Sequence, residues 1–323
     1  MPTRSPVARL SVAVCAAATA VSLTACSGDE AEADTGLLAA LSHVAATDAS
    51  TTYVEYGDVA AIGKLAEHDR RRFAQLAGYG YSELAMSADR IAEKLGVDPR
   101  GFSSAIWVGQ PPETAGLLIG DYDTGKVSDG FEKIGAEQED KGEAIRWRSA
   151  ADRATDLSGP FTDLGLLTQF NVVSVEEGKF GYSSAGGSLD WVTDPGETTL
   201  ADDEQIRTLA TCLGDPVVAI IATQDERKVA VGVRAPSATE LTEVVCSLTG
   251  DPQADRDRMT TELAEGRAPS SGQPWAEILP GAEVDIPDGS SGVVRVVSTP
   301  GDTAPPGRIA QVLANGDLKG LTG

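Results

Sequence analysis

The amino-terminal segment is the feature of this 323-residue chain that most constrains the fold. Its residues are not expected to form part of a folded domain. Arg4 and Arg9 precede an apolar run from Leu10 to Val21 that is rich in alanine and valine. A membrane-spanning helix needs about 20 apolar residues, and this run is shorter. A charged start, a short apolar centre and a small-residue exit are typical of a removable signal peptide. We therefore expect residues 1–25 to be a signal peptide, removed on export.

The apolar run closes on Leu23-Thr24-Ala25-Cys26. This resembles the lipobox of bacterial lipoprotein precursors, in which signal peptidase II cuts before a cysteine that carries diacylglycerol. Position by position, Leu23 matches the apolar residue at −3, Ala25 the small residue at −1 and Cys26 the lipidated residue. The resemblance implies lipid attachment at Cys26, with acyl chains such as palmitate holding the protein at the extracytoplasmic face of the cell membrane. The alternative is an ordinary secretory signal with Cys26 at the cut.

Residues 26–36 carry four carboxylates and no large apolar side chain. Such a segment buries too little apolar surface to offset the entropy cost of ordering. We expect it to be a flexible acidic tether. Beyond residue 26 no motif matches a specific family, and the format is similar to that of lipoproteins of high-G+C Gram-positive bacteria.

The net charge is −23, with 49 acidic and 26 basic residues. Nucleic-acid binding needs a basic surface that neutralises phosphates, so we expect no nucleic-acid partner. The cluster Arg70-Arg71-Arg72 follows Glu67 and Asp69 and is interpreted as a solvated helix face. The expected partner is the membrane, through the anchor, and a protein or cell-wall partner stays open.

After loss of Cys15 and acylation of Cys26, Cys212 and Cys246 remain. Two cysteines in an exported domain indicate one disulfide. Apolar stripes predict helices over 203–213 and 237–248, with each cysteine on a flank. A redox pair or a metal site is the alternative, although the sequence has no CxxC motif and no nearby histidine.

Helical and extended patterns mix without the strict alternation of a doubly wound sheet, which predicts an α+β fold. We expect an N-terminal helical segment followed by two mixed or antiparallel sheets with packed helices, in domains 37–200 and 201–323. Helices are expected over 37–46, 59–77, 83–95, 203–213, 237–248 and 308–313, and strands over 52–56, 104–108, 115–119, 144–148, 172–175, 179–182, 217–222, 229–232, 282–286 and 293–297.

The two halves of the sequence show a weak internal similarity. Leu117–Gly120 leads into a helix with Val127 and Phe131, and Val229–Gly232 leads into the helix expected over 237–248. The pattern suggests a duplicated β-β-α-β-β-α unit. A chance similarity is the alternative, because an apolar strand followed by an amphipathic helix is common.

Catalytic motifs are missing from the sequence. There is no GxSxG or GxxxxGK[ST] motif, and both histidines, His43 and His68, lie near the N-terminus. Gly78-Tyr79-Gly80-Tyr81 lacks the third glycine of a dinucleotide fingerprint and follows a helix rather than a strand. We therefore expect no catalytic residue and no cofactor.

Two acidic stretches imitate a calcium loop, beginning at Asp121 and Asp251. Position 6 of each is Lys126 or Arg256, where a glycine is required. We interpret these acids as helix starts and expect no metal site. The four tryptophans are expected to pack in the core rather than line a cleft; they are Trp107, Trp147, Trp191 and Trp275.

These observations predict a lipid-anchored envelope protein that acts as a non-enzymatic binding or interaction module. One alternative is the solute-binding lipoprotein of a transporter, which would need a large cleft between two lobes. The other is an extracytoplasmic hydrolase, which would need two acids with opposed pKa shifts in a deep pocket.

Overall fold

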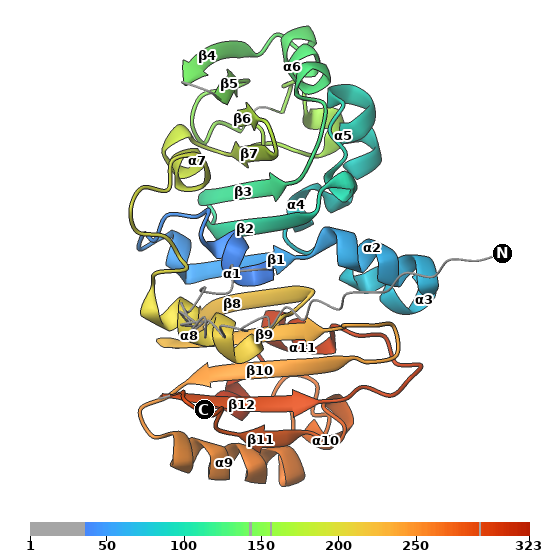
Figure 1. Cartoon of the computed structure of the whole chain (residues 1–323), viewed down its shortest axis with the longest axis vertical. Coiled ribbons are helices and arrows are strands. Elements are labelled where there is room, and N and C mark those ends of the chain that lie inside the picture. The colour runs from blue at the N-terminus through green and yellow to red at the C-terminus, as the bar shows by residue number, and fades with distance from the viewer. Residues whose placement is uncertain (1–35, 142–143, 156, 291) are drawn as a thin grey trace, which may run out of the picture. The chain divides into compact units, whose positions relative to one another are not determined.

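A single antiparallel sheet of twelve strands runs through the part of the chain that the computed structural model describes, residues 36–141, 144–155, 157–290 and 292–323. The strand order is β11-β12-β10-β9-β8-β1-β2-β3-β7-β6-β5-β4 (Figure 1). The strands are β1 (Tyr53–Gly57), β2 (Ser104–Gln110), β3 (Glu113–Ile119), β4 (Glu137–Lys141), β5 (Ala144–Arg148), β6 (Val172–Glu176), β7 (Lys179–Ser183), β8 (Val218–Gln224), β9 (Arg227–Arg234), β10 (Thr242–Leu248), β11 (Glu283–Asp285) and β12 (Val293–Ser298). The α+β class is confirmed, but the two expected sheets are one.

Strand β1 joins the two halves of the sheet. It pairs with β2 on one side and with β8 on the other, where Tyr53 faces Ala222 and Gly57 faces Val218. The expected boundary after residue 200 therefore separates no sheets, and the described residues from 36 onward group into one compact unit. The physical reason is that each edge of a strand carries unpaired N–H and C=O groups. Local sequence patterns do not reveal which distant strand satisfies them.

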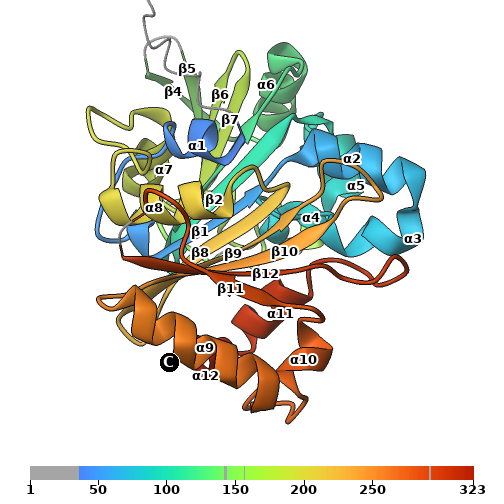
Figure 2. The same cartoon turned by 60° about the horizontal axis from the view of Figure 1, so that its bottom comes forward.

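Helices cover both faces of this sheet. Helices α1, α7 and α8 lie on one face, and α9–α12 lie on the opposite face (Figure 2). Helices α2 and α4–α6 pack on that same opposite face over the first half. The helices are α1 (Gly36–Leu41), α2 (Val59–His68), α3 (Arg70–Phe73), α4 (Ser82–Ala85), α5 (Ala88–Leu95), α6 (Thr124–Lys133), α7 (Gly186–Thr193), α8 (Glu204–Leu213), α9 (Pro252–Glu265), α10 (Trp275–Ile278), α11 (Arg308–Ala314) and α12 (Lys319–Thr322).

Two expected helices are broken into shorter ones. The helix expected over 59–77 ends at His68 because Asp69 leaves helical geometry and caps α3, accepting a hydrogen bond from the Arg72 N–H. Short polar side chains offer the backbone this alternative to a continuous helix. The helix expected over 83–95 is likewise divided into α4 and α5 at Met86-Ser87.

The helix expected over 237–248 is wrong, because residues 242–248 form strand β10. Val244 and Cys246 face the α8 side of the sheet, whereas Val245 faces the other side. β10 lies between β9 and β12 with both faces buried, so it carries apolar residues on both sides. A short run of this kind cannot be distinguished from a buried helix by periodicity. The second half therefore has β10 where the first half has α6, and this part of the suggested duplication fails.

The core confirms the expected packing of two tryptophans. Trp147 is 5% exposed and Trp275 is fully buried. Trp107 and Trp191 are only partly buried and pack at the margins of the core.

Candidate functional site

A cavity of about 420 Å³ lies at the centre of the sheet, where the helices of the two halves meet on one face. We call it the seam pocket. Its floor is formed by Tyr53 and Glu55 of β1 and Ile220 of β8. One wall is the segment 77–86, and the other is α11, through Ala310 and its neighbours. The side chain of Met86, at this pocket, is 93% exposed. The seam pocket is thus assembled from residues far apart in the sequence.

The wall segment around Gly78-Tyr79-Gly80-Tyr81 lies directly on the sheet. Gly80 has φ +81°, and a Cβ atom there would overlap the backbone of Ala105 on β2. A Cβ atom at Gly57 of β1 would similarly overlap the carbonyl of Tyr79. Glycine is required where φ is positive and backbones approach closely. This is the physical role of the motif that lacks the third glycine of a dinucleotide fingerprint.

Glu55 fixes this segment from below. The side chain is 6% exposed, and Oε1 accepts a hydrogen bond of 2.8 Å from the Gly80 N–H. Burial raises the pKa of Glu55, while hydrogen bonds from Ser82 and Gly80 oppose that rise. The carboxyl group therefore acts as an internal acceptor for the backbone at the start of α4.

Glu83 lies close to Glu55 and belongs to the same polar cluster. The Trp107 Nε1–H donates a hydrogen bond of 2.9 Å to Glu83, and the Trp107 ring meets Tyr53 edge to face at 5.4 Å. Burial raises the pKa of Glu83, and repulsion from Glu55 adds to the rise. Burial and Glu55 also raise the pKa of Tyr79, to about 12. The two acids therefore shift in the same direction and lack the opposed shifts of an acid–base pair.

Glu243 performs the corresponding task in the second half. It lies on β10, is 2% exposed, and accepts hydrogen bonds from the N–H groups of Gly307, Arg308 and Ile309 at 2.6, 2.9 and 3.1 Å. These are orphan donors at the start of α11. Both walls of the seam pocket are therefore fixed to the sheet by a buried glutamate from a strand.

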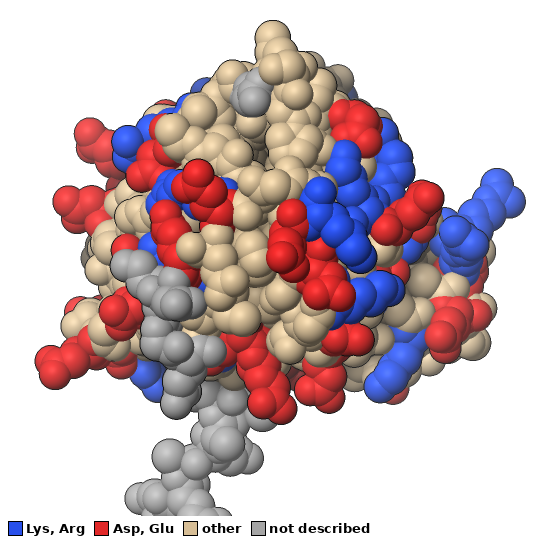
Figure 3. Space-filling model, turned by 90° about the horizontal axis from the view of Figure 1, so that it is seen from above, with Lys and Arg blue, Asp and Glu red and all other residues tan. Residues whose placement is uncertain are grey.

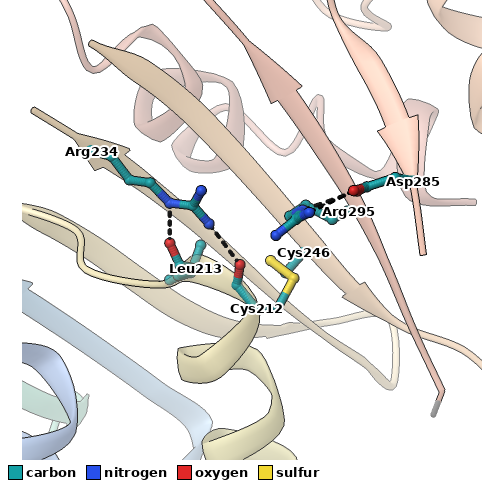
Figure 4. The surroundings of a disulfide bond; sticks show 6 residues. All are labelled: Cys212, Leu213, Arg234, Cys246, Asp285 and Arg295. Carbon is teal, nitrogen blue, oxygen red and sulfur yellow. Dashed lines mark hydrogen bonds and ion pairs between the residues drawn. A yellow bond between two sulfur atoms is a disulfide. The ribbon is translucent and has the colours of Figure 1, made fainter. Parts of the chain in front are cut away.

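The disulfide between Cys212 and Cys246 is confirmed (Figure 4). It joins α8 to β10, with a Cα–Cα distance of 6.2 Å, instead of joining two helices as expected. Arg234 donates to the carbonyl groups of Leu213 and Cys212 beside it. The bond therefore ties the helix that follows the first half to the sheet of the second half.

Cys26, the expected lipid attachment site, and the lipobox around it lie outside the described residues. Within the described ranges no helix is both long and apolar enough to cross a membrane.

The two acidic stretches are helix starts. Asp123 accepts a 2.9 Å hydrogen bond from the Lys126 N–H at the start of α6, and Asp251 accepts one of 3.1 Å from the Ala254 N–H at the start of α9. Among the described residues no group of three or more His, Cys, Asp or Glu side chains could hold a metal ion. His43 is partly buried, and burial lowers its pKa.

Charged side chains of both signs lie interspersed on the face shown in Figure 3. In the cluster Arg70–Arg72, the first two arginines are exposed as expected. Arg72 is partly buried and donates to the carbonyl groups of Ala238 and Ala304. That arginine therefore serves packing rather than solvation.

Sequence reasoning missed Glu55, Glu83 and Glu243. The available signal was an isolated carboxylate within an apolar strand, as in Tyr53-Val54-Glu55-Tyr56. A buried charge is costly unless it is hydrogen-bonded, so such a residue indicates a dedicated set of donors. Because the chain has 49 acidic residues, these three did not stand out in the sequence.

Comparison with known proteins found no matching family model and no matching curated protein. Among solved structures, crystal forms I and III of TP0453 resemble this chain, at 10% identity and TM-scores of 0.40 and 0.37. The similarity covers 85% of this chain and 96% and 97% of those chains. A resemblance of this size identifies no function.

Proposed function

We propose that this chain is a lipid-anchored, extracytoplasmic binding module that holds a small neutral or cationic ligand in the seam pocket without converting it. The observation that carries the proposal is the lining of that pocket. Glu55 and the phenols of Tyr53 and Tyr79 supply polar groups, and no Lys, Arg or His lies among the described residues that line it. The lipobox at Cys26 supports the location, and the disulfide suits an oxidising compartment.

The electrostatics favour a ligand that is not an anion. Burial raises the pKa of Tyr79, and the nearby carboxyl groups of Glu55 and Glu243 add to the rise, so both acids act on a residue that lines the pocket. The chain as a whole carries a net charge of −23. A positively charged amine would be attracted by this field and by the faces of the aromatic rings. An anion of the same size would be repelled.

The hydrogen bonds of the acids support binding rather than turnover. The acids of the site and of its walls accept hydrogen bonds from the chain itself, Glu55 from Gly80, Glu83 from Trp107 and Glu243 from the start of α11. These contacts hold the carboxyl groups in place, whereas a general base must have an oxygen aligned with the substrate proton. Burial raises the pKa of Glu55 and of Glu83 alike, so neither residue is set as the base to the other's acid.

A matched series of probes tests the pocket. Benzylamine, benzyl alcohol and benzoate differ in charge at nearly constant size, and ligand binding raises the melting temperature by mass action. We expect the largest rise with benzylamine, a smaller rise with benzyl alcohol and none with benzoate. Ala314→Trp, at the exposed edge of the pocket, should abolish the rise, whereas Ala60→Trp on α2 should leave it unchanged. An equal rise with benzoate, or a rise that survives Ala314→Trp, would refute the proposal.

A further inference from the structure

We propose that a second cavity of this protein binds a single-chain amphiphile with an anionic headgroup. This cavity of about 340 Å³ lies among α2, α3 and Tyr81, and it shares Ala77 and Gly78 with the seam pocket as a common wall. We call it the tail pocket. The inference is independent of the seam pocket's ligand, because the two cavities share only Ala77 and Gly78 and otherwise have different linings.

The lining of the tail pocket is apolar and made of small residues. Val59 and Ile62 of α2 and the ring of Tyr81 form its buried part. Gly63 and Ala66 complete the α2 side, and a Cβ atom at Gly63 would meet no atom within 4 Å. Protein interiors are close-packed, with few voids larger than a water molecule. An open apolar cavity of this size is therefore suited to an apolar tail and lies within the range of small-molecule sites, about 300–1,000 Å³.

The mouth of the tail pocket carries a free cation. Arg70, the first residue of α3, is exposed, and its guanidinium makes no hydrogen bond or ion pair with any residue that the structure describes. Arg100, also at the pocket, differs because Asp89 and Asp98 hold it at 2.6 and 2.8 Å. The carboxylate of Asp69, next to Arg70, accepts a hydrogen bond from the Arg72 N–H. The Arg70 guanidinium is thus available to a carboxylate or phosphate, which it can bind through two parallel hydrogen bonds.

The apolar lining and Arg70 together indicate which class of ligand the tail pocket binds. An apolar wall with a cation at its mouth matches a molecule that has an alkyl tail and an anionic head, and it repels the same tail on a cationic head. A carboxylate and a phosphate monoester share the chemistry that Arg70 recognises. The ligand is therefore either a fatty acid or a single-chain phospholipid, and separate probes distinguish the two.

The test uses the full chain as its Cys26→Ser form, so that no lipid anchor competes for the pocket, and measures binding by calorimetry below the micelle concentration of each probe. We expect dodecanoate or dodecyl phosphate to bind, the tighter of the two identifying the headgroup. Dodecyltrimethylammonium and acetate should not bind, because one has the wrong charge and the other no tail.

Two substitutions with matched controls localise the site. Arg70→Gln should weaken anion binding at least tenfold, and Arg71→Gln, an exposed neighbour outside the tail pocket, should change it less than twofold. Gly63→Leu should fill the cavity and abolish binding, whereas Ala60→Leu on the same helix should not. Equal binding of the cationic amphiphile, or an Arg70→Gln variant that binds as the Cys26→Ser parent does, would overturn the proposal. Since Arg70 is exposed, that variant gives an answer even if Gly63→Leu fails to fold.

Discussion

At the scale of single residues, buried carboxyl groups and glycines build the centre of this protein. Glu55 and Glu243 each take backbone N–H groups that would otherwise be unsatisfied, and Gly57 and Gly80 allow the wall segment to touch the sheet. An unsatisfied buried donor costs about 1–3 kcal/mol. These few side chains therefore decide whether the seam pocket has a wall.

Replacing Gly80 by Ala should destabilise the protein by more than about 2 kcal/mol, because the position combines a positive φ with direct overlap of the new Cβ and Ala105. Gly63→Ala is the matched control: its Cβ meets open space in α2, so it should be neutral or stabilising by up to about 1 kcal/mol. Urea unfolding of both variants measures the difference. Equal effects would contradict the close approach of the wall segment.

Glu83→Gln should change how stability depends on pH. The folded pKa of Glu83 is raised above its ordinary value of 4.5, so its contribution to stability is fully present below that pH and is lost as pH rises through the folded pKa. Gln imitates the protonated form at every pH. The variant should therefore gain stability relative to wild type as pH rises above 4.5, as measured by denaturant unfolding.

Trp107→Phe is a control that should change the pH dependence of stability in the opposite direction. The indole N–H of Trp107 lowers the pKa of Glu83, so its loss should raise that pKa further. Stability should then fall more steeply with rising pH than in wild type. Parallel pH profiles for wild type and both variants would show that Glu83 does not titrate in this environment.

At the scale of elements, the disulfide fixes α8 to β10 of the sheet. α8 follows the first half in sequence, yet it packs on the face of β10 that holds Cys246. The disulfide closes a loop with a sequence separation of 34 residues. It restrains the unfolded chain within the second half, over the segment that holds β8 and β9.

The double variant Cys212→Ala/Cys246→Ala should lose about 3–4 kcal/mol of stability, the loop-closure contribution in the chain-entropy model. Intact mass of the native protein should be two hydrogens lower than after reduction, and maleimide should label no thiol before reduction. Labelling of Cys246 in the native protein would contradict the bond. A loss well below about 2 kcal/mol would instead mean that the reduced, unfolded chain retains structure.

At the scale of the whole molecule, the expected anchor and the continuous sheet define the arrangement that we propose. The twelve strands form one unit, and both proposed pockets lie on one face of it, on either side of Ala77-Gly78. A lipid at Cys26 would keep these pockets at high effective concentration near the membrane surface.

Cys26→Ser should move the protein from the detergent phase to the aqueous phase in Triton X-114 partitioning, because a chain without acyl groups has no stable anchor. Thr24→Ser is a suitable control, since it leaves both Ala25 and Cys26 in place. A Cys26→Ser protein that stays in the detergent phase would show that Cys26 is not the lipid attachment site.

Local features could be predicted from the sequence. Hairpins such as β6–β7, the caps at Asp123 and Asp251, the α+β class and the cysteine pair all follow from interactions within a few residues or from composition. Three features depend on contacts between distant segments: β1 joins both halves in one sheet, residues 242–248 form a strand, and Glu55, Glu83 and Glu243 accept hydrogen bonds from Gly80, Trp107 and the start of α11. Pairing partners and burial on both faces depend on residues far apart in the chain. The same apolar run fits a helix or a strand until its neighbours are in place.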